Sequence, residues 1–115
     1  MRFVFKYAPA MSTRFVHLHV HSEYSLVDST VRIKPLVAQT VERGMGAVAL
    51  TDMSNLFALV KHFKACTAAG VKPIFGADLW IRHEARDQKL SRLVLLCQND
   101  TGYLNLKHLV SRSYQ

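Results

Sequence analysis

The chain has 115 residues, which gives room for one domain or for part of one. Half of the residues are hydrophobic and 20% are charged, a balance that excludes an intrinsically disordered chain. The formal net charge of +7 favours polyanionic partners such as nucleic acids or acidic protein faces, but it specifies none of them.

The first residues carry no strong targeting signal. The apolar run within residues 1–13 is too short for a signal peptide, and no run in the chain reaches the ~18 residues of a membrane span. We expect a cytoplasmic protein without a membrane partner. Residues 1–13 are expected to be a flexible lead or a misassigned start.

A strict alternation over residues 15–21 is the first clear structural pattern. His17, His19 and His21 fall on one face of a predicted strand, and aliphatic residues fall on the other. The polar stretch that follows, residues 22–30, is typical of turns. The sequence therefore places three imidazoles along one strand face.

Helices and strands then alternate. Pro35 suits the first turn of a helix, and Gly44 suits the left-handed residue that follows a helix end. The apolar run 47–51 is typical of a strand buried on both faces. A second helix is predicted to be capped by Ser54 or Asn55 and to end near residue 70.

The last third of the chain predicts a hairpin and a helix. Strands are expected at 72–76, 77–83 and 93–97, with a charged loop at 84–89, and Asn99 or Asp100 is expected to cap the final helix. The predicted order is β-α-β-α-β, then a hairpin, then α. It predicts an α/β fold with mainly parallel strands, either an open sheet or part of a barrel.

Several reactive or charged residues have ordinary structural interpretations. Cys66 and Cys97 are expected to be reduced, buried thiols rather than a disulfide or a metal pair. Three further histidines fall in charged stretches and are expected to be solvated: His62, His83 and His108. Four cations are expected on solvated helix faces, with nucleic-acid contact as the alternative: Lys61, Lys64, Lys107 and Arg112.

Polar side chains gather where the predicted strands end, and ligands of α/β folds bind there. Imidazoles two residues apart on a strand project to one side about 6.5–7 Å apart, so His19 and His21 could bind one metal or two neighbouring metals. Asp52 and Asp78 would add oxygen ligands to a site for Zn, Mn or Fe. A metal-free hydrogen-bond network among the same residues is the alternative, and Asp52 could instead cap a helix.

Four segments in the right order carry a resemblance to a known family: residues 15–25, 49–56, 70–78 and 95–106. Together they resemble the N-terminal PHP (polymerase and histidinol phosphatase) domain of bacterial DNA polymerase III alpha subunits, over residues 14–115. The resemblance implies the first part of a distorted (β/α)7 barrel with a metal cluster in its mouth. It also implies that the later ligands and the polymerase active site lie in other parts of such proteins.

Carried over position by position, the resemblance assigns His19, His21 and Asp52 to metal-ligand positions, with Asp78 where the family usually has Glu. Met53 stands where metal-binding members have His, and Arg92 stands where they have another His ligand. A protonated guanidinium repels a cation, so Arg92 is expected to pair with Asp52 or Asp78 and to replace the charge of the metal. This pattern resembles proteobacterial members whose PHP domain is inactive.

Two functional hypotheses follow from the resemblance. The first is a catalytically silent scaffold of a replicative DNA polymerase that docks a proofreading exonuclease, the epsilon subunit, beside other replicase subunits, and that meets DNA through the parent polymerase. The second is a metal-dependent phosphoesterase or 3′-5′ exonuclease that uses the His/Asp cluster. A third hypothesis, suggested by the net charge, is a free-standing DNA-binding module. We also expect the isolated segment to self-associate through its open sheet edge.

Overall fold

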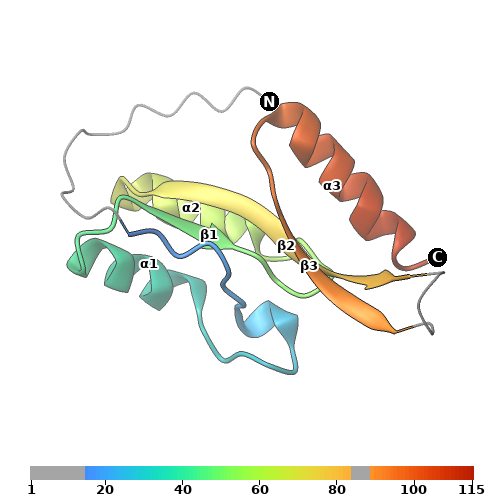
Figure 1. Ribbon diagram of the computed structural model, residues 1–115. Helices are drawn as coiled ribbons and strands as arrows, with labels where there is room; N and C mark the ends of the chain where they lie inside the picture. Colours follow the sequence, from blue (N-terminus) through green and yellow to red (C-terminus); the bar gives the residue numbers. More distant parts are fainter. Residues whose placement is uncertain (1–14, 84–88) are drawn as a thin grey trace.

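The structure is a computed structural model that describes residues 15–83 and 89–115 (Figure 1). The predicted lead at residues 1–13 and most of the predicted loop at 84–89 lie outside the described residues. The elements in chain order are η1 (Glu23–Ser25), α1 (Ile33–Glu42), β1 (Ala47–Leu50), α2 (Leu59–Ala69), β2 (Lys72–Arg82), β3 (Leu90–Leu96) and α3 (Asp100–Arg112).

The sheet has the order β1-β2-β3 and confirms the predicted α/β fold with a hairpin. β1 pairs with β2 in parallel over four residue pairs, and β2 pairs with β3 in antiparallel fashion over seven. The two strands predicted at 72–76 and 77–83 are one continuous strand. Its first part pairs with β1 and the rest pairs with β3, so no turn separates the two halves.

Gly76 marks the point where β2 changes partner. A Cβ atom at this position would lie 2.3 Å from the Leu95 carbonyl oxygen and 2.9 Å from a methyl carbon of Thr51. Because the first contact is with backbone, a side chain here would force β2 and β3 apart. Gly76 thereby permits the close approach that sets the register of Asp78, two residues later.

The predicted first strand is not a regular strand. Residues 15–22 run beside β1 (Figure 1), but only His17 forms a ladder bridge, to Val48. The segment is held by the Ala49 and Thr51 N–H groups, which donate to the carbonyls of His17 (2.9 Å) and Val20 (2.8 Å). Without a full ladder the alternation breaks, and the His17 ring packs against Phe15 rather than joining the other two imidazoles.

The helix boundaries confirm some predicted caps and correct one. Gly44 and Gly70 both have positive φ angles, and Asn99 accepts a hydrogen bond from the Gly102 N–H at the start of α3. α2 begins only at Leu59, later than predicted. Asn55 caps a preceding turn instead, because its side-chain oxygen accepts from the Phe57 N–H.

His62 is fully buried, so the prediction that it is solvated was wrong. Its ring Nε2 lies 3.2 Å from the Val48 carbonyl oxygen, and Cys66 Sγ lies 3.7 Å from its Nδ1. Burial lowers the pKa of His62 and raises the pKa of the Cys66 thiol to about 12. Helix periodicity places residue 62 beside Cys66, on the face that packs against the sheet.

Both cysteines are free, as expected, although Cys97 is only half-buried. α3 covers the other part of the sheet, where Leu106 packs with Ala77 and Leu79. Within residues 15–83 and 89–115, none of the helices combines the length and apolar character needed to cross a bilayer.

Candidate functional site

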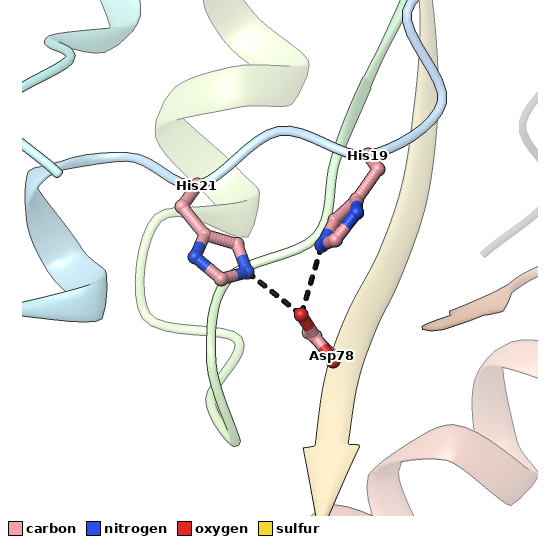
Figure 2. A group of neighbouring side chains, drawn as sticks. All are labelled: His19, His21 and Asp78. Carbon is pink, nitrogen blue, oxygen red and sulfur yellow. Dashed lines mark hydrogen bonds and ion pairs between the residues drawn. The ribbon is translucent and has the colours of Figure 1, made fainter. Parts of the chain in front are cut away.

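Two histidines and one aspartate converge beside the sheet. The Nε2 atoms of His19 and His21 lie 2.8 and 3.0 Å from the same oxygen of Asp78, Oδ2 (Figure 2). The two imidazole centroids are 5.2 Å apart, and the three ligand atoms all lie within 4.8 Å of one another. The structure therefore unites three of the four predicted ligands, from segments about 60 residues apart in sequence.

Asp78 is fixed by its backbone on β2. Its N–H donates to the Asp52 carbonyl at 3.0 Å, and its own carbonyl accepts from the Ser54 N–H at 2.8 Å. These bonds extend the parallel pairing beyond β1 as far as Met53. The Asp78 side chain is fully buried, so its carboxylate can remain charged only with compensating donors.

Arg92 supplies the strongest of these donors. Its Nη2 lies 2.5 Å from Asp78 Oδ2, which confirms the predicted pairing between Arg92 and one of the two aspartates. Arg92 faces Trp80 in the β2–β3 register, two positions along β2 from Asp78, so the guanidinium and the carboxylate share one sheet face. The guanidinium also lies 5.6 Å from the centre of the Trp80 ring.

The pKa of Asp78 reflects opposing effects. Burial is the largest influence and raises it, but hydrogen bonds from Arg92, His19 and His21 together outweigh burial, so the pKa lies below its usual value. The hydrogen bond between Arg92 and Asp78 also raises the pKa of Arg92. The carboxylate is therefore held ionised by protein groups.

The two oxygens of Asp78 are used unequally. Oδ2 faces all three donors, whereas Oδ1 is buried and has no hydrogen-bond partner among the described residues. A buried acceptor without a partner costs free energy. The cluster nevertheless directs all three donors to Oδ2 and leaves Oδ1 without one among the described residues.

His21 has a second partner that the sequence analysis missed. Its Nδ1 lies 2.8 Å from Asp28 Oδ2, and its backbone carbonyl accepts from the Ser29 hydroxyl at 2.7 Å. A carboxylate on the far nitrogen of a histidine fixes the orientation of the ring. Asp28 lies in the polar stretch for which the sequence predicted only turns. The one feature that could have indicated this contact is an acidic residue seven positions after His21.

Asp52, the remaining predicted ligand, does not join the cluster. Its Oδ1 accepts from the Ser22 N–H at 2.5 Å and the Ser25 hydroxyl at 2.9 Å, and its Oδ2 accepts from the Ser22 hydroxyl at 2.8 Å. The residue is 2% exposed. Asp52 therefore anchors the turn around η1 to the end of β1, and it does not cap α2.

The spacing of the ligand atoms suits a metal, but the local charge does not. Two imidazole nitrogens and a carboxylate oxygen are ligands that Zn, Mn and Fe accept. However, the oxygen that would bind the cation already contacts the Arg92 guanidinium, whose charge would repel the cation. With Arg92 in this position, the donor set does not fit a divalent cation.

A family model for the PHP domain matches residues 17–115. The chain belongs to the PHP domain family. This confirms the resemblance found in the sequence segments around His19, Asp52 and Asp78.

Relatives of this PHP chain include much longer proteins. It is 53% identical over 104 residues to a DNA polymerase III subunit alpha from Pseudomonas fluorescens, and 46% identical over 102 residues to the one from Escherichia coli strain K12. These matches cover 90% and 89% of the chain. The chain spans only 9% of the length of each of these relatives.

Solved structures confirm the fold of this PHP chain. A protein described as a metal-dependent phosphoesterase from Bifidobacterium adolescentis aligns with a TM-score of 0.56 at 19% identity, over 73% of this chain and 27% of that one. An amidohydrolase from Chromobacterium violaceum aligns with a TM-score of 0.57 at 18% identity, over 81% and 31%. Identities this low establish a shared fold and not a shared reaction.

Proposed function

We propose that residues 14–115 form the N-terminal part of the PHP domain of a bacterial replicative DNA polymerase alpha subunit. In this proposal the domain is cytoplasmic and serves DNA replication as a catalytically silent scaffold. Nucleotidyl transfer, the DNA-directed DNA polymerase reaction, belongs to other parts of such a protein. The identities of 53% and 46% to alpha subunits over about nine-tenths of the chain support this assignment.

One contact carries the proposal that the site is silent. Arg92 Nη2 lies 2.5 Å from Asp78 Oδ2, the oxygen that His19 and His21 also contact. The cationic guanidinium therefore occupies the position where a metal ion would bind. A guanidinium is a permanent charge that cannot activate a water molecule as a bound metal does. The cluster is thereby suited to hold the histidine segment against the β2–β3 hairpin and not to hydrolyse a phosphate ester.

Metal analysis tests the silent site directly. Protein purified without chelators is expected to hold less than one equivalent of tightly bound Zn, Mn or Fe by elemental analysis. The double variant His19→Ala/His21→Ala is the matched control and should hold the same small amount. The hypothesis of a silent scaffold would be contradicted if the parent chain held stoichiometric metal and the variant lost it.

Such a result would favour the second candidate, a metal-dependent phosphoesterase or 3′-5′ exonuclease. The observation in its favour is the closeness of three ligand atoms, all within 4.8 Å of one another. In that case His19, His21 and Asp78 would hold the ion, and the metal would supply an activated water. Release of phosphate from a model phosphodiester, lost in the histidine double variant, would support it.

The proposed partners are other replicase subunits, above all a proofreading exonuclease (epsilon) subunit, with DNA met through the parent polymerase. Support comes from the names of the relatives, which describe them as subunits and therefore as members of an assembly. Co-elution of this chain with an epsilon subunit in size-exclusion chromatography tests the docking. Separate elution at micromolar concentrations of both proteins would contradict it.

A further inference from the structure

A groove runs over the surfaces of α1 and α2, and none of its lining residues belongs to the cluster of His19, His21 and Asp78. Its volume is about 700 Å³. Its lining residues come from the segment around η1 and from both helices: Glu23, Arg32, Ile33, Lys34, Pro35, Lys61, Lys64, Ala65 and Ala68. α1 and α2 pack against each other, and residues of both helices line the groove.

Positive charge dominates the rim of this α1–α2 groove. Four cations line it: Arg32, Lys34, Lys61 and Lys64. The one carboxylate that lines it, Glu23, lies 3.7 Å from Arg32 in an exposed ion pair, so four cations and one carboxylate leave the lining with a net charge of +3. The sequence predicts a solvated helix face for Lys61 and Lys64; in the structure both line a concave surface together with Lys34.

Part of the groove wall is held in place by contacts within the fold. Lys61 Nζ donates a hydrogen bond to the Tyr24 hydroxyl and lies 5.0 Å from the centre of that ring. Tyr24 and Ala65 in turn pack against a buried cluster that contains Ile33. A binding surface fixed in this way loses little conformational entropy when a ligand arrives.

The groove is also elongated and apolar at its base. A second hollow of about 330 Å³ shares Lys34, Ala65 and Ala68 with it and continues between the two helices toward Ala38 and Ala69. On α2 the lining residues of the two hollows run from Lys61 to Ala69, which is about two turns of that helix. An elongated shape of this kind matches a peptide segment better than a small molecule.

We propose that the α1–α2 groove docks an acidic amphipathic peptide segment of a partner protein. Carboxylates of the segment would face the four cations on the rim, and its apolar side chains would cover the alanines and Pro35 at the base. A nucleic-acid backbone would match the charge but would leave the apolar base without a partner. The ring of Tyr24 is already covered by Lys61, so it offers no free stacking surface for a base.

Fluorescence anisotropy with a defined probe tests this proposal. The probe is a fluorescein-labelled helical peptide with leucines on one face and glutamates flanking that face. Its controls are a scrambled peptide of the same composition and a labelled single-stranded oligonucleotide. We expect the patterned peptide to bind at least about tenfold more tightly than either control, with affinity that falls as salt rises.

Two matched charge reversals locate the binding. Lys34→Glu/Lys64→Glu should weaken binding at least about tenfold, whereas Lys107→Glu/Arg112→Glu, which makes the same change in net charge on α3, should alter it by less than about twofold. Ala68→Gln at the exposed base of the groove should also weaken binding without any change of charge. Circular dichroism confirms that each variant folds.

Each other result overturns the proposal. Equal binding of the scrambled peptide, or equal effects of the two charge reversals, would mean that nonspecific attraction to a basic protein explains the binding. Tighter binding of the oligonucleotide that is lost in Lys34→Glu/Lys64→Glu would identify a nucleic-acid surface instead. Unchanged binding in Ala68→Gln would exclude contact with the base of the groove.

Discussion

Arg92 on β3 and Asp78 on β2 form an ion pair in which Arg92 Nη2 lies 2.5 Å from Asp78 Oδ2. His19 and His21 approach the same oxygen. One buried carboxylate thus meets three nitrogen donors, one of them permanently charged. The contact joins the hairpin to the histidine segment and neutralises a carboxylate that burial alone would destabilise. The same arrangement explains how a site with metal-ligand residues can be stable without a cation.

Removal of Arg92 should therefore open the cluster to metal. We expect Arg92→Ala to bind Zn²⁺ at least about tenfold more tightly than the parent chain in competition with a chromophoric chelator, because the repelling charge is gone. The same substitution should lower the melting temperature without metal, since Asp78 loses its strongest donor. The triple variant Arg92→Ala/His19→Ala/His21→Ala is the control; if it binds Zn²⁺ as tightly, the gained site lies elsewhere.

Asp52 should behave as a structural anchor and not as a ligand. Asp52→Ala leaves the Ser22 N–H and two buried hydroxyls without an acceptor, and we expect it to lower the free energy of unfolding by about 3 kcal/mol. Ser25→Ala, which removes one of these donors and also the acceptor of the Met53 N–H, should cost about 1–2 kcal/mol. Urea denaturation measures both effects.

The two substitutions should also couple, because they remove the same contact. In a double-mutant cycle the combined loss should be smaller than the sum of the single losses. Zn²⁺ affinity measured in the Arg92→Ala background should be the same with and without Asp52→Ala. A loss of Zn²⁺ affinity on removal of Asp52 would restore its predicted role as a ligand.

The sequence predicted the architecture because each element has a local cause. Gly44, Gly70 and Asn99 terminate or cap helices where they were expected, and the apolar run of β1 is fully buried. The histidine segment was harder to predict because alternation alone does not guarantee a ladder. Once the pairing is reduced to a single bridge at His17, the side chains are directed by Asp78 and not by the pleat.

The site was partly predictable for a similar reason. His19, His21, Asp78 and Arg92 follow from the strand register and the family pattern, since each lies on or beside a regular element. The bonds of Asp52 to Ser22 and Ser25, and of Asp28 to His21, depend on the path of an irregular turn. No periodicity specifies that path, so the hydrogen bonds of Asp52 and of Asp28 could not be predicted from the sequence.

His62 should make the stability of the fold depend on pH near neutrality. Burial lowers its pKa below the ordinary value of 6.5, against the opposing effects of the Val48 carbonyl and of Asp52. As the pH falls below 6.5, the unfolded chain takes up a proton that the folded chain does not, so stability is highest above that pH and falls in acid. The slope approaches at most about 1.4 kcal/mol per pH unit.

Urea denaturation between about pH 7.5 and 5.5 measures this slope. His62→Leu removes the titrating group, so the free energy of unfolding should depend less on pH. This expectation holds even if the substitution changes the stability at pH 7.5. His108→Leu, at an exposed position on α3, is the matched control and should leave the slope unchanged. Equal slopes in the parent chain and in His62→Leu would show that another group is responsible.

The outer edge of β3 is the surface best suited to self-association. Within residues 15–83 and 89–115, β3 pairs only with β2, and three of its leucines are 41–55% exposed: Leu90, Leu93 and Leu96. An edge strand of this kind pairs readily with another strand. An antiparallel pairing of two copies centred on Leu93 would set Arg92 of one copy opposite Val94 of the other, so like charges do not meet.

We therefore expect light scattering at micromolar concentration to give about twice the chain mass of 13.0 kDa. Leu93→Lys places a charge at the centre of the edge and should return the protein to a monomer, because edge lysines oppose strand pairing. Leu104→Lys makes the same exchange at a residue of α3 that is 50% exposed, and it should leave the dimer intact. A monomeric parent chain would show that the β3 edge needs no second copy. A dimer that dissociates in Leu104→Lys but survives in Leu93→Lys would move the contact from the strand to the helix.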